Sequence, residues 1–163
     1  PDRMVGANMA VGKNVFEKVP KFDPELGPGQ LGFGGETLFS LQMQEAGFQI
    51  QAAFDVVVEH HPDTTRFSRK GFREMAKKRG KSAAHINYHW RHHTDWNPIF
   101  LLAGLVFFGI KIAWWRLRHA QSIADTEGHS MEEFELLRRF YRIQQHLVEQ
   151  RHEPKYPSQN TMV

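Results

Sequence analysis

The sequence predicts an α/β unit that is followed by a mostly α-helical tail. Residues 48–58 pass from alternating apolar residues into a β-branched run, which is typical of a strand that becomes buried. A helical pattern over residues 37–46 precedes this strand, and helical patterns dominate the chain from residue 66 onward. The 163 residues, of which 40% are apolar, suffice for a folded domain with a real core.

The composition excludes several kinds of site. The chain has no cysteine, so disulfides and thiolate metal sites are excluded, and a reducing compartment such as the cytosol is favoured. The net charge of +3 is modest, so the distribution of the charges matters more than their total. The chain begins at Pro1 without an apolar signal segment, and we expect it to be part of a longer polypeptide.

The first 22 residues suggest a strand and a short helix. Residues 4–11 form a short apolar run, which we expect to be a buried strand or strand end. A short helix is expected around residues 14–19. Asp23 closes this part of the chain, because the residue before Pro24 is pushed out of helical geometry.

The stretch from Gly27 to Glu36 is the candidate catalytic loop. Six of its ten residues are Gly or Pro, which suits a backbone that turns and lies close to a ligand. Glu36 is predicted at the start of the helix over residues 37–46, where the helix dipole favours a carboxylate. The alternative is that Glu36 is an ordinary acidic residue of a first helical turn.

Polar residues follow the predicted strand over residues 48–58. His60 and His61 come directly after this strand, and the end of a buried strand often carries functional groups in α/β proteins. Either histidine could ligate a metal or contact a phosphate. The alternative is a surface or hydrogen-bonded histidine.

The order and spacing of six short motifs resemble the C-terminal half of a family 2 glycosyltransferase catalytic domain. The resemblance covers residues 4–61 and implies the GT-A fold, which is a Rossmann-like α/β fold. It rests on Gly6-Ala7-Asn8-Met9-Ala10, Phe22-Asp23, Leu26-Gly27-Pro28-Gly29, Gly34-Gly35-Glu36, Ala46-Gly47-Phe48 and Val56-Val57-Val58-Glu59-His60.

The resemblance implies an inverting sugar transfer from a nucleotide-sugar donor to a hydroxyl of a saccharide, lipid or protein acceptor, as in the synthesis of cell-envelope polysaccharides. Glu36 takes the position of the family's general base, which is usually an Asp, and Asn8, Asp23, Gly34 and Gly35 are the implied substrate-binding residues. A second alignment would place Thr37 at the position of the base and so remove the base.

The resemblance also implies a divalent metal, Mn or Mg, that bridges the donor diphosphate. His60 is the residue implied to contact this metal, and a neutral imidazole suits Mn better than Mg. The family's Asp-x-Asp metal motif occurs nowhere in these residues. We therefore expect a fragment that lacks the donor-binding half and is inactive alone.

Residues 66–95 form a predicted basic segment with a helix that Ser68 could cap. Such a helix could bind nucleic acid, bind a membrane surface or be a solvated face. Nucleic acid is the weakest of the three, because no RNA-binding or zinc-finger signature accompanies the charges. Four histidines also fall here, and interface residues are favoured over a metal site for them because no acidic partner accompanies them: His85, His89, His92 and His93.

Residues 96–120 contain a predicted apolar helix that associates with the membrane. Its uncharged part ends at Lys111, and Trp114 and Trp115 with two following arginines resemble an interfacial anchor. We expect it to lie in the plane of, or partly inserted in, the inner face of the cell membrane, so that the protein is cytoplasmic and peripheral or monotopic. The alternative is a buried core helix that packs on the missing half of the catalytic domain.

The pattern of residues 121–163 predicts an amphipathic helix that ends near Gln150, followed by a disordered C-terminus.

The features of the whole sequence support two functional classes. The first is a glycosyltransferase with Glu36 as the base, and the second is a non-catalytic membrane-surface binding or scaffold module that uses the basic and Trp-rich helices.

Overall fold

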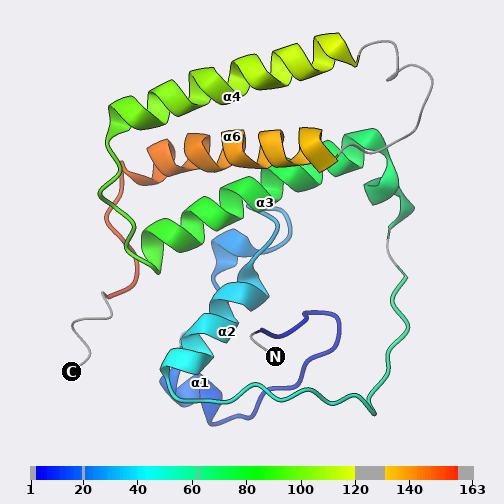
Figure 1. The fold of residues 1–163 in the computed structure, drawn as a ribbon. Coiled ribbons are helices and arrows are strands. Elements are labelled where there is room, and N and C mark those ends of the chain that lie inside the picture. The colour runs from blue at the N-terminus through cyan, green and yellow to red at the C-terminus, as the bar shows by residue number, and fades with distance from the viewer. Residues whose placement is uncertain (1–2, 20, 62, 120–130, 158–163) are drawn as a thin grey trace. The chain divides into compact units, whose positions relative to one another are not determined.

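The computed structural model describes residues 3–19, 21–61, 63–119 and 131–157. The chain divides into two compact units, Pro1–Pro62 and Asp63–Val163, and each is described here by itself. The disorder expected at the C-terminus concerns residues 158–163, which lie outside the described residues. Figure 1 shows the course of the chain through both units.

The N-terminal unit contains three short helical elements: α1 (Val15–Lys18), the 3-10 helix η1 (Pro24–Leu26) and α2 (Gly35–Glu45). Phe39 of α2 is completely buried, and the ring of Phe22 stacks on it with 4.4 Å between the ring centroids. Val15, Val19 and Met43 complete this small core. The expected helices at residues 14–19 and 37–46 are therefore present, with small shifts of their ends.

The predicted α/β fold, and with it the C-terminal part of a GT-A domain, is wrong for this structure. Neither residues 4–11 nor residues 48–58 form a strand, and the described part of the chain contains only helices and irregular segments. Phe54 and Val57 are 92% and 85% exposed, so the β-branched run is not buried. The physical reason is that a strand needs a neighbouring strand to pair its backbone groups. The two segments share only a bond from Asn8 Nδ2 to the Val56 carbonyl, at 3.0 Å.

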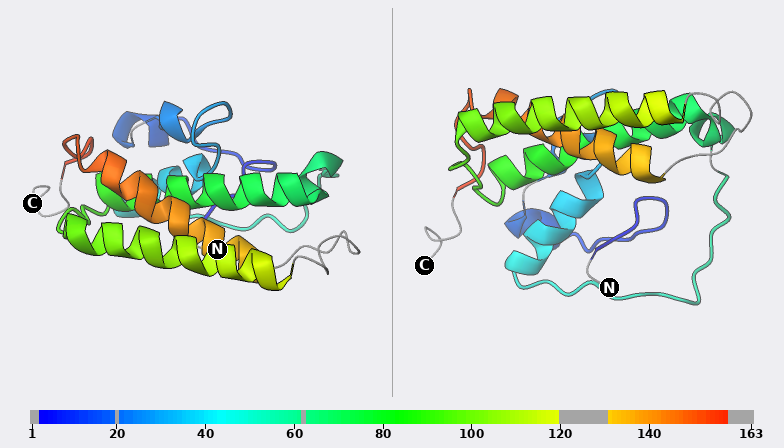
Figure 2. Two further views of the ribbon diagram at one scale, coloured as in Figure 1. Left: turned by 90° about the horizontal axis from the view of Figure 1, so that it is seen from above. Right: turned by 45° about the horizontal axis from the view of Figure 1, so that its top comes forward.

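Among its described residues the C-terminal unit has three long helices, which follow the 3-10 helix η2 (Thr64–Phe67). These are α3 (Arg69–His89), α4 (Pro98–Arg118) and α6 (Met131–Glu149). The helix α6 packs against both α3 and α4. Figure 2 shows that α3 and α6 run in the same direction and that α4 runs antiparallel to them. The three helices expected after residue 66 are thus present.

Local sequence signals determine the residues at which α3 and α4 begin. The Ser68 hydroxyl accepts a hydrogen bond from the Gly71 amide at 3.0 Å, which caps α3 as expected. The Asn97 side chain accepts one from the Ile99 amide at 2.9 Å, and Pro98 occupies the first position of α4. Both ends therefore satisfy backbone donors that would otherwise lack an intrahelical partner.

The contact between α3 and α6 depends on Gly80. A Cβ at this position would clash with the carbonyl oxygen of Arg138 and lie 3.0 Å from the amide nitrogen of Arg142, both in the backbone of α6. Because backbone atoms cannot rotate away as a side-chain end can, the two helices approach each other as closely as they do only with a glycine here.

We predict that Gly80→Ala lowers the free energy of unfolding of the C-terminal unit by about 1–3 kcal/mol, the usual cost of overpacking. Gly109→Ala is the matched control, because its Cβ would meet Phe140 at an ordinary 3.8 Å. Its better helix propensity should leave the stability unchanged or raise it by up to about 1 kcal/mol. Urea unfolding followed by circular dichroism measures both, and equal effects of the two variants would contradict the role of Gly80.

Candidate functional site

The predicted base, Glu36, lies in the first turn of α2. Gly34 precedes this helix with φ of 88°, a left-handed conformation that glycine adopts without strain, and its carbonyl accepts the first helical bond from the Leu38 amide at 2.8 Å. The glycine at the end of the loop thus turns the chain into the helix. Gly35 is the first residue of α2, and the half-buried Glu36 follows it.

The carboxyl group of Glu36 lies against the backbone of Gly6. A Cβ built on Gly6 would clash with Glu36 Oε1, and it would lie 2.9 Å from the carboxyl carbon. A second link joins the same two segments, because the Met4 amide donates to Ser40 Oγ at 2.9 Å and Ser40 Oγ donates to the Glu36 carbonyl at 2.6 Å. The structure therefore brings the first and fourth motifs of the resemblance together.

A cavity of about 400 Å³ lies next to the N-terminal segment. Met4, Asn8 and Met9 line one part of it, and residues of the segment 49–56 line another part. Glu36 is not among its lining residues. Asn8, a predicted substrate-binding residue, therefore borders a space large enough for a small ligand, while the predicted base lies beside Gly6.

Asp23 and His60 are placed differently from Asn8. Asp23 is buried, and its Oδ1 accepts a hydrogen bond from the Glu25 amide at 2.9 Å, so it caps η1. His60 is exposed in the extended segment after residue 48. Within the described residues it belongs to no group of three possible metal ligands, and its role as a metal contact stays a prediction.

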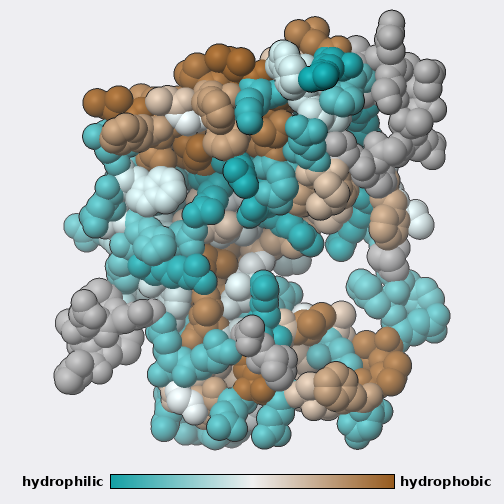
Figure 3. All heavy atoms as spheres, viewed as in Figure 1, coloured by the Kyte–Doolittle hydropathy of each residue, from teal (hydrophilic) through white to brown (hydrophobic). Residues whose placement is uncertain are grey.

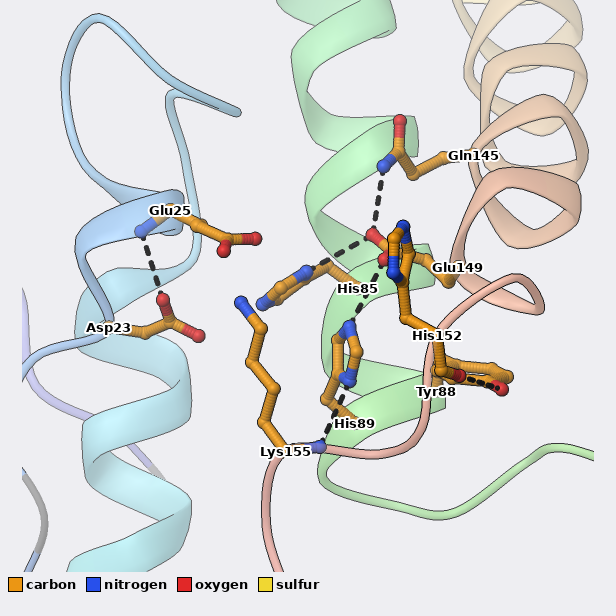
Figure 4. A network of polar contacts seen from close by, with 9 residues as sticks. All are labelled: Asp23, Glu25, His85, Tyr88, His89, Gln145, Glu149, His152 and Lys155. Atoms are coloured by element: carbon orange, nitrogen blue, oxygen red, sulfur yellow. Dashed lines mark hydrogen bonds and ion pairs between the residues drawn. The ribbon is translucent and has the colours of Figure 1, made fainter.

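The most buried polar cluster is in the C-terminal unit (Figure 4). Glu149 of α6 lies between two histidines of α3, with its Oε1 3.1 Å from His85 Nδ1 and its Oε2 3.0 Å from His89 Nε2. Gln145 Nε2 donates a further hydrogen bond to Oε1 at 2.8 Å. All three members of the His–His–Glu group are at least 95% buried, since their exposed fractions are 0%, 1% and 5%.

The hydrogen bonds define the protonation of this cluster. Burial alone would raise the pKa of Glu149, but the hydrogen bonds from His85, His89 and Gln145 outweigh it and hold that pKa far below its usual range. The ionised carboxylate only accepts, so both imidazole nitrogens that face it donate. His89 Nδ1 in turn accepts from the Lys155 amide at 3.2 Å, which matches a ring with its proton on Nε2.

This cluster is the group in the described residues whose ligand atoms lie close enough to hold a metal, all within 4.8 Å of one another. Metal binding at His89 Nε2 requires that nitrogen to be unprotonated, and the proton would then sit on Nδ1, against the amide of Lys155. In the observed network each donor therefore faces an acceptor, and a metal could bind only if the Lys155 backbone moved. The three residues do not indicate whether such a metal would be Mn or Mg.

Glu149 is the residue of this cluster that the sequence did not reveal. Val148, near the end of α6, is 40% exposed, whereas the next residue, Glu149, is buried. At this end of α6 the contact with α3 is made by polar residues such as Glu149, whereas nearer its start Phe134 packs against Phe72 of α3. Hydrophobic periodicity in the sequence does not reveal a polar contact of this kind between two helices.

The outer side of α4 is apolar and exposed. Ile99, Phe100 and Leu117 are 72%, 77% and 78% exposed, and Figure 3 shows apolar residues gathered along this helix. By length and composition α4 is the one helix in the described residues that could cross a membrane. Most of its apolar side chains are exposed in this chain, and the alternative of a core helix that packs on a part of the protein outside this sequence stays a prediction.

Comparisons of this chain with known proteins found no match among family models, curated proteins or solved structures. The resemblance to family 2 glycosyltransferases therefore stays a prediction that rests on the motifs themselves.

We predict that Glu149→Gln lowers the free energy of unfolding at pH 7 by about 1.5–3 kcal/mol, since hydrogen bonds to a charged group are lost and an amide donor faces an imidazole donor. Because the pKa of Glu149 is depressed by folding, its stabilisation is complete above its unfolded pKa of about 4.3 and is lost as the pH falls below that value.

Urea unfolding at neutral pH and at about pH 3 measures this difference. The exposed Glu153→Gln is the matched control and should change stability by less than about 0.5 kcal/mol. A cost of Glu149→Gln that is equal at both pH values would contradict the ionised network.

Proposed function

We propose that this chain takes part in an inverting glycosyl transfer in which Glu36 is the general base. The observation that carries the proposal is the position of Glu36 in the first turn of α2, after the left-handed Gly34 and with its carboxyl group against Gly6. The motifs that resemble family 2 glycosyltransferases supply the reaction class. The proposal concerns the reaction and does not extend to the α/β fold.

In this reaction the Glu36 carboxylate takes the proton of an acceptor hydroxyl while the hydroxyl oxygen attacks the anomeric carbon of a nucleotide sugar. The bond from that carbon to the diphosphate oxygen breaks, and the nucleoside diphosphate leaves with the bonding electron pair. A carboxylate at the start of a helix is favoured by the helix dipole. A divalent metal near His60 would offset the charge of the leaving diphosphate.

We expect Glu36→Gln to lower sugar transfer by at least about 100-fold, because the amide cannot accept a proton at neutral pH. Glu36→Asp should retain part of the activity, since Asp is the residue that the resembling family usually carries. Gly6→Ala should also lower the rate, because its methyl group would displace the Glu36 carboxyl group.

The test measures transfer from radiolabelled nucleotide sugars in membranes that contain the native gene product. Glu17→Gln, an exposed residue of α1, is the matched control and should leave the rate unchanged. Full activity of Glu36→Gln would overturn the catalytic proposal and leave the non-catalytic membrane-binding module as the function of the chain.

A specific observation favours membrane association in either case, namely the exposed apolar side of α4. We propose that α4 lies in the plane of the inner face of the cell membrane with this side in the lipid, so that the protein is cytoplasmic and peripheral or monotopic. Its other side packs on α6, where Trp115 Nε1 donates to Glu132 at 3.2 Å and Gly104 lies against Ile143.

Packing along α6 supports an in-plane helix over a spanning one. If α4 crossed the bilayer, α6 would enter the hydrocarbon beside it together with Glu133 and the Arg138–Glu135 ion pair, which is costly. In the plane, the cations near the C-terminal end of α4 can reach the headgroups. Among them Arg118 lies over the ring of Trp114, 5.0 Å from its centroid.

We predict that Phe107→Ser lowers binding to liposomes by about tenfold, the effect of removing one apolar side chain from lipid. Phe67→Ser is the matched control, because Phe67 is exposed to a similar extent, 57% against 54%, but lies in η2. Co-sedimentation with vesicles measures both. Equal losses for the two variants would show that α4 is not the membrane-binding surface.

A further inference from the structure

Arg142, in the middle of α6, is a half-buried cation without a counter-ion. Within the described part of the chain its guanidinium has no hydrogen bond or ion pair, and its contact is with the ring of Trp96, 5.9 Å from the ring centroid. Burial, followed by the nearby positive charges of Arg138, Arg91 and Arg139, lowers the pKa of Arg142. A cation in this position lacks the compensation that buried charges normally have.

A second buried group beside Arg142 also lacks a partner. His146 is 4% exposed, and its Nε2 makes no hydrogen bond to the described residues. Both side chains line a cavity of about 10 Å³, which is large enough for about one water molecule. His93, Asn87 and Trp96 line the same cavity. A cation and an unsatisfied ring nitrogen therefore meet at one small opening, and no carboxylate lines it.

An apolar groove begins where this cavity ends. Its volume is about 240 Å³, and its lining residues are Trp96, Asn97, Phe100, Leu101 and Ile143. Trp96 and Ile143 line both spaces. Phe100 belongs also to the exposed apolar side of α4, so the groove continues into the surface that we place in the lipid. The two spaces together combine a cationic end with an apolar end.

We propose that this corner binds one anionic phospholipid, with its phosphate outside the one-water cavity on the accessible part of Arg142 and an acyl chain in the groove against Phe100 and Leu101. A guanidinium binds two phosphate oxygens at once, and Trp is favoured at the interface between headgroups and acyl chains. Arg91 and Arg139 lie close enough to Arg142 to add positive charge at this corner. The site rests on the membrane association of α4 proposed above.

The test compares binding of the full chain to phosphatidylcholine vesicles with and without phosphatidylglycerol, by co-sedimentation. We expect wild type to prefer the anionic vesicles, and Arg142→Gln to lose at least about fivefold of this preference. Arg142→Lys should lose a similar factor, because it keeps the charge but not the two-point contact. Arg139→Gln removes an exposed charge from the same helix and should lose less than about twofold.

Each outcome separates the site from the membrane surface. Equal losses for Arg142→Gln and Arg139→Gln, or full retention by Arg142→Lys, would overturn the specific site in favour of diffuse surface charge. Equal binding of wild type to both kinds of vesicle would overturn the site but leave α4 as the membrane surface, and binding to neither would overturn both. Circular dichroism confirms that each variant is folded before it is used.

A free anion is distinguished from a lipid without vesicles. Inorganic phosphate should raise the melting temperature of the wild-type protein by no more than it raises that of Arg142→Gln, because the acyl chain supplies much of the binding. Stabilisation of wild type alone by inorganic phosphate would show a soluble anion site and overturn the lipid assignment.

Discussion

Two buried carboxylates of α6 hold the three long helices of the C-terminal unit in register. Glu133, near the start of α6, accepts hydrogen bonds from Arg73 of α3 at 2.8 Å and from Arg116 of α4 at 3.3 Å. Glu149, at its end, accepts from the two histidines of α3. A buried charge is tolerated only with partners on all sides, so α3 and α6 cannot slide past each other without leaving a carboxylate unpaired.

In this arrangement several charged and polar side chains of the unit are buried, while many apolar side chains of α4 are exposed. The face between α3 and α6 contains carboxylates, imidazoles and a glycine contact beside an apolar cluster that includes Ala76 and Phe134, whereas α4 turns much of its apolar surface outward. A helix with this distribution is stable when its outer side meets lipid instead of water. The membrane proposal and the phospholipid corner at Arg142 therefore share one observation, which is that α4 leaves much of its apolar surface exposed.

The N-terminal unit obtains its candidate site from short-range geometry. The left-handed Gly34 turns the chain into α2, and Glu36 follows in the first turn, where its position depends on backbone conformation over three residues. Gly6 reaches the same carboxyl group from another segment because it has no side chain. The contact of Gly6 with Glu36 and the turn at Gly34 form without a sheet. The proposed reaction therefore does not require the predicted α/β fold.

The sequence by itself determined the helices, because their signals are local. Ser68, Asn97 with Pro98, and Gly47 with its φ of 83° act within one turn of the helix end that each defines. Tertiary structure alone decided the rest. Residues 48–58 carry every local mark of a strand but have no partner strand in the described chain, and Glu149 meets His85 and His89 across 60 or more residues of sequence. Pairing of strands and pairing of buried charges are both contacts between distant segments, and no local pattern contains them.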